Sequence, residues 1–243
     1  MRLVCWFSCG AASAVATKIA LQEYASIADK HIVYCDTGAE HPDNARFLKD
    51  CEKWFQHSIT TLRSDTYKDI WEVFQKTRYL AGVKGARCTT ELKKMVRNRF
   101  QIADDKQVFG FDSTETIRAD RFRKNNFEID LVAPLIDNKI SKAKCFEMLT
   151  DAGIELPAMY KLGYKNNNCI GCVKGQSGYW NKIRVDFPDV FARMAKVERE
   201  LDVALNKSYA GDGKRKRVFL DELDPKAGRY SKETGLTCGV LCQ

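Results

Sequence analysis

The sequence predicts an α/β protein with a mostly parallel, twisted sheet that carries helices on both faces. Strand-like and helix-like segments alternate through the first half of the chain, and such alternation is typical of parallel sheets. Of the 243 residues, 44% are hydrophobic and 30% are charged, which indicates a folded globular chain. This length allows one such domain with a full core and a smaller appendage.

The alternation begins with an apolar strand over Leu3–Phe7 and a helix over Ala14–Tyr24. A strand over His31–Cys35 and a helix from Asp43 to about Phe55 repeat the unit. The other expected elements are strand-like at Ser58–Leu62, Val108–Phe111 and Leu131–Ile136, and helical at Tyr67–Gln75, Thr90–Asn98, Ser141–Ala152 and Asp189–Leu205. Residues 206–232 are polar, charged and glycine-containing, and this composition predicts a mobile segment.

The first strand runs directly into the small residues Ser8-Cys9-Gly10-Ala11-Ala12-Ser13. A strand that passes straight into a helix leaves backbone N–H groups uncovered at the helix start, where the helix dipole favours an anion. Gly10 and Ala11 allow close approach of an anion, and Ser8 and Ser13 add hydroxyl donors. The segment therefore predicts a phosphate site, with an ordinary βα turn as the alternative.

Asp36 and Thr37 follow the second strand in the same way. A carboxylate there could bind ribose or adenine, or hold Mg²⁺ on phosphates. The alternative is an Asx turn that closes the strand. Because ligands of parallel sheets bind beyond the carboxyl ends of the strands, this segment and the small-residue turn could share one crevice.

Ten cysteines are many for this length. The apolar start breaks at Ser8 and does not read as a signal peptide, so we expect a reducing cytoplasm, where thiols serve metals or chemistry. Four of them, in apolar strands and helical patterns, are expected to be small buried residues: Cys5, Cys35, Cys51 and Cys145.

Cys169 and Cys172 have the spacing that lets two thiolates face one metal, as in zinc and iron–sulfur sites. Cys88, among basic residues, is the best third ligand, and the alternative is a pair of loop thiols without a metal. Cys238 and Cys242 end a chain segment that we expect to be flexible, where a thiol could enter a crevice as a nucleophile. The alternative is a tail with incidental cysteines.

The formal net charge is +8, which favours anionic ligands without choosing among them. The run Lys214-Arg215-Lys216-Arg217 could contact nucleic acid, although such runs are more often solvated loops. No apolar stretch is long enough to span a bilayer, so no membrane partner is expected.

Taken together, these segments resemble the sulfonucleotide reductases, which are the phosphoadenylyl sulfate (PAPS) and adenylyl sulfate (APS) reductases. That family belongs to the adenine nucleotide α-hydrolase-like, Rossmann-like folds. The similar segments, in chain order, are Phe7–Ser13, Val33–Gly38 with His41-Pro42, Arg87–Lys93, and a run through Pro134–Asp137, Gly153, Pro157, Tyr160 and Gly163-Tyr164 to Cys169 and Cys172. The resemblance covers residues 3–174 well and the tail weakly.

The resemblance implies a nucleotide-binding α/β domain over residues 1–160 and a cysteine-containing C-terminal region over 161–243. It implies that an adenylyl nucleotide (PAPS, APS or ATP) is bound by Ser8, Gly10, Ala11, Ser13, Asp36, Thr37 and Arg118. It implies a [4Fe–4S] cluster, with zinc as the alternative, on Cys88, Cys169 and Cys172. The fourth ligand would come from Cys242, from Cys238 or from a small molecule, or one iron would stay open. Thr237–Leu241 is similar to the family's catalytic tail motif, so Cys238 would be the catalytic thiol and a thioredoxin-like protein the electron donor. The chain could also form a homo-oligomer.

The sequence also departs from the family. Arg87 stands where cluster-bearing members have a second cysteine, and Gly110-Phe111-Asp112 replaces a Gly-x-Arg substrate motif. The missing arginine and the basic run favour an alternative, an ATP- and Mg²⁺-dependent adenylating sulfurtransferase that acts on nucleic acid. A non-catalytic nucleotide- or metal-binding protein is the third class of function.

Overall fold

The computed structural model describes residues 1–82, 85–209, 215–233 and 236. Its centre is a five-stranded sheet in which every paired strand is parallel, in the order β3-β2-β1-β6-β7. The strands are β1 (Arg2–Trp6), β2 (Lys30–Cys35), β3 (Ile59–Leu62), β6 (Asp105–Val108) and β7 (Asp130–Val132). The chain builds outward from β1 to β3 and then returns to the other side of β1. The predicted fold class, a parallel sheet with helices, is confirmed.

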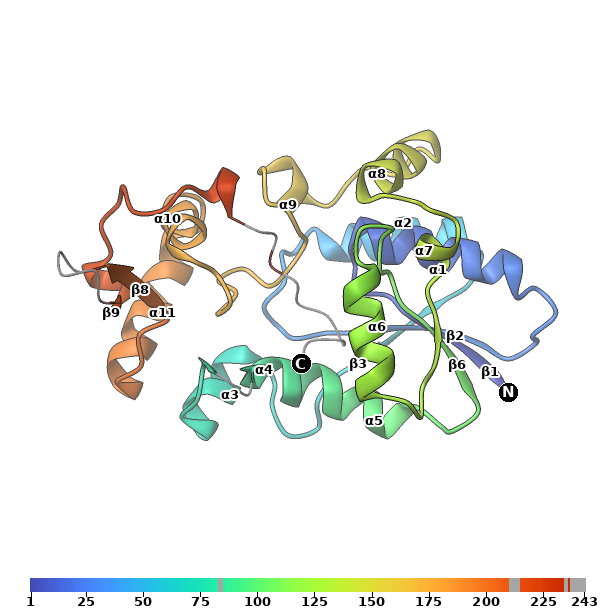
Figure 1. Ribbon diagram of the computed structural model, residues 1–243, viewed down its shortest axis with the longest axis horizontal. Coiled ribbons are helices and arrows are strands. Elements are labelled where there is room, and N and C mark those ends of the chain that lie inside the picture. Colours follow the sequence, from blue (N-terminus) through green and yellow to red (C-terminus); the bar gives the residue numbers. More distant parts are fainter. Residues whose placement is uncertain (83–84, 210–214, 234–235, 237–243) are drawn as a thin grey trace.

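Helices cover both faces of this sheet, as Figure 1 shows. The first face is covered by α1 (Ala11–Glu23), α2 (Asn44–Phe55), α7 (Pro134–Asp137) and α8 (Lys142–Asp151), and the second by α5 (Met95–Phe100) and α6 (Thr116–Asn125). Along β1, Leu3 and Cys5 join the core on the first face, whereas Val4 and Trp6 join the core on the second. This alternation follows from the two-residue period of a strand.

Some boundaries differ from the expected ones. Helix α1 begins at Ala11 rather than Ala14, because small residues with good helix propensity form its first turn. Strand β6 covers Asp105–Val108 and so shares only Val108 with the expected strand Val108–Phe111. It pairs with β1 over the register from Arg2↔Asp105 to Cys5↔Val108. The expected extended segment Leu131–Ile136 is only partly extended, since Pro134 starts the short helix α7.

A second hydrophobic core lies beside the sheet region and contains Trp180, which is completely buried. It is assembled from α3 (Ile70–Thr77), α4 (Arg87–Thr89), the π-helical turn η1 (Thr90–Lys94), the cysteine loop (Cys169–Cys172), α10 (Ser177–Asp186), α11 (Pro188–Leu201) and η2 (Leu220–Glu222). Smaller elements are β4 (Ala81–Gly82), β5 (Gly85–Ala86), α9 (Ala158–Lys161) and η3 (Tyr230–Lys232). The sequence analysis does not predict helix α10.

Regular structure also occurs within residues 206–232, for which the composition predicts a mobile segment. Strands β8 (Asn206–Tyr209) and β9 (Arg215–Val218) form an antiparallel hairpin. Leu220 and Leu223 anchor the chain after the hairpin in the second core. Figure 1 places this hairpin far from the N-terminus. Among the described residues, no helix is both long and apolar enough to cross a membrane.

Candidate nucleotide-binding site and cysteine loop

The small-residue turn after β1 gathers several donors at one point. The backbone N–H groups of Ser8 and Gly10 donate to the hydroxyl of Ser13, at 3.1 and 3.3 Å. The Ser8 hydroxyl lies 3.0 Å from the same oxygen. The first N–H groups of α1 point the same way along the helix axis. The Ser13 hydroxyl oxygen thus occupies the point where these backbone donors converge, which is where the sequence predicts a phosphate.

The turn is held in a strained conformation at Cys9, which has a φ of 59°. Positive φ is uncommon for a residue other than glycine and persists only where the surroundings enforce it. Here the Asn167 amide donates to the Cys9 carbonyl at 2.6 Å and to the Asn44 side-chain oxygen at 2.8 Å. Asn167 and Asn44 are both buried. The small-residue turn Ser8–Ser13 is therefore tied directly to Asn167, which lies two residues before Cys169.

A pocket opens beside this turn, between the carboxyl ends of β1 and β6. Strand order reverses at this point, and such switch points are where open α/β sheets bind ligands. The pocket is lined by the end of β1 and the turn after it, the segment after β6, the starts of α6 and α8, α9, the loop Asn166–Asn168 and Leu236. The lining residues are Trp6, Ser8, Gly10, Ala12, Ser13, Phe109, Gly110, Asp112, Glu115, Arg118, Lys142, Tyr160, Asn166, Asn167, Asn168 and Leu236.

Gly110 brings the two sides of the pocket together. A Cβ atom at this position would lie 2.7 Å from the backbone N and Cα atoms of Ser13. The end of β6 therefore packs directly on the first turn of α1, and only glycine leaves enough room. The sequence marks Gly110 as part of a motif but does not predict this contact.

The charged side chains of the pocket are balanced. Arg118 pairs with Glu115 and lies over the ring of Phe111, 5.3 Å from its centroid. Lys142 donates to the Lys165 carbonyl and to the side-chain oxygen of Asn166. Burial lowers the pKa of Lys142, and nearby Asp112 and Glu115 oppose that shift. Sequence reasoning missed Lys142, because nothing nearby in the sequence marks it as a pocket residue.

Tyr160 closes one side of the small-residue turn Ser8–Ser13. Its hydroxyl accepts a hydrogen bond from the Ala11 N–H at 3.3 Å. Burial raises the pKa of Tyr160 to about 12, so this group remains a neutral phenol at physiological pH. The backbone N–H of Ala11 is thus bonded to Tyr160, while the Ala11 side chain is completely buried in the sheet core.

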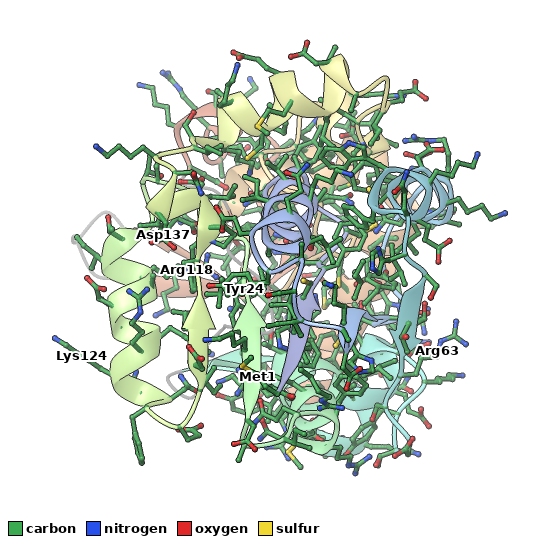
Figure 2. All side chains as sticks on the ribbon, turned by 90° about the vertical axis from the view of Figure 1, so that its right-hand side faces the viewer. Met1, Tyr24, Arg63, Arg118, Lys124 and Asp137 are labelled. Atoms are coloured by element: carbon green, nitrogen blue, oxygen red, sulfur yellow. The ribbon has the colours of Figure 1, made fainter. Side chains whose placement is uncertain are left out.

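Asp36 and Thr37 lie at the carboxyl end of β2, and the described lining of the pocket includes neither of them. The Asp36 carboxylate accepts from the Gly38 N–H at 2.8 Å and pairs with Arg63 at 2.8 Å. This is the Asx-turn arrangement. Figure 2 shows Arg63 and Arg118 at opposite edges of the sheet. Thr37 instead faces the cysteine loop, with its hydroxyl 3.0 Å from the Cys169 sulfur.

The cysteine loop, Cys169–Cys172, is fixed by Tyr179 of α10. The Tyr179 hydroxyl accepts from the Cys172 N–H at 2.9 Å and lies 3.3 Å from the Cys169 carbonyl oxygen, to which it can donate. Gly171 has a φ of 76°, and a Cβ there would lie 2.7 Å from a methyl group of Val190. The loop conformation is therefore imposed by the second core.

Cys88 belongs to the same hydrophobic cluster as Cys169 and Cys172. The two loop cysteines are buried, and Cys88 is half-buried. Within the described part of the chain, no group of three or more His, Cys, Asp or Glu side chains is arranged to hold a metal ion. The predicted catalytic residue Cys238 and the predicted ligand Cys242 lie outside the described residues.

The remaining predicted cysteines match their expected role. Cys5, Cys35, Cys51 and Cys145 are all buried. Burial raises the pKa of Cys5 to about 12 and that of Cys35 to about 11. Such thiols are not ionised near neutral pH, which confirms that they serve as small core residues.

Comparison of the sequence with models of known protein families found no match. Comparison with curated proteins found none either.

Proposed function

We propose that this protein is a sulfonucleotide reductase-like enzyme that binds an adenylyl nucleotide, PAPS or APS, at the switch-point pocket. The observation that carries the proposal is the cradle of backbone donors around Ser13, beside Arg118 and Lys142. A phosphate there would replace the Ser13 hydroxyl as the acceptor of the backbone N–H groups. Arg118 and Lys142, whose charges Glu115 and Asp112 balance in the structure, are the cations that could meet the further negative charge of a sulfonucleotide. Asp112 provides an acceptor for hydroxyl groups of the ligand.

The thiol chemistry would come from Cys238. Leu236 lines the pocket, and two residues of extended chain span at most about 7 Å, so the tail leads from the pocket wall itself. In the proposed reaction the Cys238 thiolate attacks the sulfate sulfur, and the bond from that sulfur to the phosphate oxygen breaks. The electron pair leaves with AMP or adenosine 3′,5′-bisphosphate.

The reduction needs two electrons, which a thioredoxin-like dithiol supplies. One donor thiolate attacks the Cys238 sulfur, and sulfite leaves. The second donor thiol then displaces Cys238 as a thiolate, while the donor becomes a disulfide. This sequence restores the enzyme and requires a reducing compartment such as the cytoplasm.

A [4Fe–4S] cluster on Cys88, Cys169, Cys172 and Cys242 belongs to the proposal, with zinc as the alternative. Cys169 and Cys172 are buried in the second core and half-buried Cys88 packs against it, so the three thiols border one core from two chain segments, although the described residues hold no ready-made group of metal ligands. When bound, the cluster would fasten α4 to the cysteine loop. Anaerobic protein with about four irons and matching sulfide per chain would support the cluster, whereas colourless protein with zinc would support the alternative.

The decisive experiment is sulfite release. Purified protein is incubated with PAPS or APS and reduced thioredoxin, and we expect sulfite from one of the two substrates. We expect no sulfite from the Cys238→Ser variant, with Cys5→Ser as a cysteine control because Cys5 is buried in the sheet core. If wild-type protein with its metal intact releases no sulfite from either substrate, the proposal fails.

A second candidate function is ATP-dependent adenylation coupled to sulfur transfer on nucleic acid. It is favoured by charge, because residues 161–243 contain 16 Lys and Arg against 10 Asp and Glu. In the β8–β9 hairpin, Lys207 stands opposite Arg217, and like charges in register are costly without an anionic partner. Pyrophosphate release from ATP and Mg²⁺ that depends on added RNA or DNA would select this function over the reductase.

A further inference from the structure

The β8–β9 hairpin carries three exposed cations, Lys207 on β8 and Lys216 and Arg217 on β9. Within the described part of the chain, none of these three side chains forms an ion pair or a hydrogen bond. A surface cation that has no carboxylate beside it keeps its full attraction for an anionic partner. The hairpin is therefore a candidate contact surface for an anion.

The register of the hairpin places these cations on both of its faces. Lys207 stands directly opposite Arg217 in the antiparallel pairing, so these two side chains share one face. Like charges in that arrangement destabilise a strand pair unless an anion lies beside them. Successive residues of a strand point to opposite faces, so Lys216 lies on the other face from Arg217. An anion on one side of the hairpin could not meet all three cations.

The hairpin extends beyond the core on which its base packs. At the base, Asn206 is buried opposite Val218, which packs against the second core. Lys216 shares a face with Val218 but lies two residues further along the hairpin, and there the side chain is exposed. The four paired positions span about 10 Å of strand. Figure 1 shows β8 and β9 at one end of the molecule, where a large partner could reach both faces.

The base of the hairpin is held firmly. The Glu198 carboxylate accepts the N–H groups of Leu205 and Leu220, at 2.6 Å each, and these two residues flank the hairpin. One buried side chain thus fixes both ends. Arg199, next to it on α11, pairs with the two acidic residues of η2, which balances the negative charge at the base. A preformed hairpin pays little ordering cost when it binds a partner.

We propose that the β8–β9 hairpin is a ribbon that enters the major groove of duplex DNA, with Lys207 and Arg217 on one phosphate backbone and Lys216 on the other. This groove is about 12 Å wide and about 8.5 Å deep, and it admits a two-stranded ribbon. Its two phosphate walls meet both faces of the ribbon at once, whereas a membrane surface meets only one. The major groove of A-form RNA is too deep and narrow. This interaction goes beyond the proposed reductase function and does not depend on it.

The test measures binding of the full-length protein by fluorescence anisotropy over a range of salt concentrations. The probes are a short labelled DNA duplex, one of its single strands, an RNA duplex of the same sequence and vesicles that contain phosphatidylserine. The hairpin variants are Lys207→Gln/Arg217→Gln for one face and Lys216→Gln for the other. Lys49→Gln/Lys53→Gln is the matched control, because it removes two exposed lysines one turn apart on α2 and the same amount of charge.

We expect tighter binding of duplex DNA than of the other three probes. The slope of log affinity against log salt should become shallower by about 2 in the double hairpin variant and by about 1 in Lys216→Gln. At low salt the affinity should fall at least about tenfold and about threefold, respectively, whereas the α2 control should keep the wild-type slope. Sulfite release should not change in any variant, because none of these side chains lines the nucleotide pocket.

Several results would contradict the proposal. Wild-type protein that does not bind the duplex, or that binds single strands or duplex RNA equally well, would exclude insertion into the DNA groove. Equal binding of the vesicles would make the partner a membrane surface. An equal loss in the α2 control would reduce the effect to net charge, and a wild-type slope in Lys216→Gln would leave one face without a contact. If no sulfite is released but the hairpin variants lose DNA affinity as expected, the proposed function fails and the DNA site stands.

Discussion

The sheet region and the second core are built on opposite plans. In the sheet region, strands β1 to β3 and their helices follow one another along the chain and pack as sequence neighbours. The second core instead joins α3 and α4, from residues 70–89, with elements that follow residue 158. The candidate site lies where these regions meet, since the small-residue turn Ser8–Ser13 belongs to the first region and the loop Asn166–Asn168 leads into the second.

The two regions therefore hold their parts of the candidate site in different ways. The small-residue turn Ser8–Ser13 follows β1 directly and belongs to the sheet core, and distant contacts also hold it, among them the hydrogen bond from the Asn167 amide to the Cys9 carbonyl. The cysteine loop depends on Tyr179 and Val190, which belong to the second core. We therefore expect the two regions to differ in how far damage to one affects the other.

The largest expected effect is that of Trp180→Ala. Trp180 is completely buried in the second core, and such a truncation costs about 3–5 kcal/mol of the free energy of unfolding. We expect loss of exchange protection in α10 and α11 while the amides of β1 stay protected. Phe47→Ala, in the sheet core, should do the reverse. Equal loss of protection in both regions would make them one cooperative unit and remove the comparison.

The next effect concerns Glu198, a completely buried residue of α11 whose carboxylate accepts the Leu205 and Leu220 N–H groups at 2.6 Å each. Burial raises the pKa of Glu198 from 4.5 to about 7. Between pH 4.5 and about pH 7, the Glu198 carboxyl group is ionised in the unfolded chain but still protonated in the folded protein. Stability from this group is therefore greatest below pH 4.5, falls as pH rises to about 7, and is then constant.

We expect this loss to reach at most about 3 kcal/mol. It is measured as the free energy of unfolding in urea at pH 5 and pH 8. Glu198→Gln should remove this part of the pH dependence, whereas the exposed control Glu147→Gln should keep it. The same slope in wild type and Glu198→Gln would show that the second core does not contain this titrating group.

Much of the sheet region could be predicted, because its signals are local. Apolar strands, the small-residue turn after β1 and the helix expected at Ser141–Ala152 are each readable within a few residues. Helix α10 could not be predicted, since its buried Tyr179 and Trp180 pack on segments far away in the sequence. Lys142 and the three asparagines were missed as site residues for the same reason. At Asp36 the Asx turn, offered as the alternative, is local and is present, whereas the pairing of its carboxylate with Arg63 involves a later segment and could not be predicted.

A third effect tests the contact between the two sides of the pocket. Gly110→Ala would place a methyl group 2.7 Å from the Ser13 backbone, and overpacking of this kind costs about 1–3 kcal/mol. Displacement of the α1 start should weaken AMP binding at least about tenfold, measured by calorimetry. Gly153→Ala is the control, since it has positive φ but no atom within 4 Å of the new methyl group. It should lose stability and keep AMP affinity. Unchanged AMP affinity in Gly110→Ala would separate the phosphate site from this contact.

The smallest expected effect is that of Tyr179→Phe, which tests how the cysteine loop is held. Tyr179→Phe leaves the buried Cys172 N–H without its acceptor, which costs about 1–2 kcal/mol. In protein treated with a chelator, we expect faster amide exchange at Cys172 and unchanged AMP affinity. Tyr230→Phe is the matched control, because it removes an equivalent hydroxyl bond, to Lys165, and should affect only the tail. If the Cys172 amide exchanges at the wild-type rate in Tyr179→Phe, the second core does not hold the loop. The cysteine arrangement would then have to be imposed by a bound metal, and the contrast with the sheet region would rest on the ligand instead of the fold.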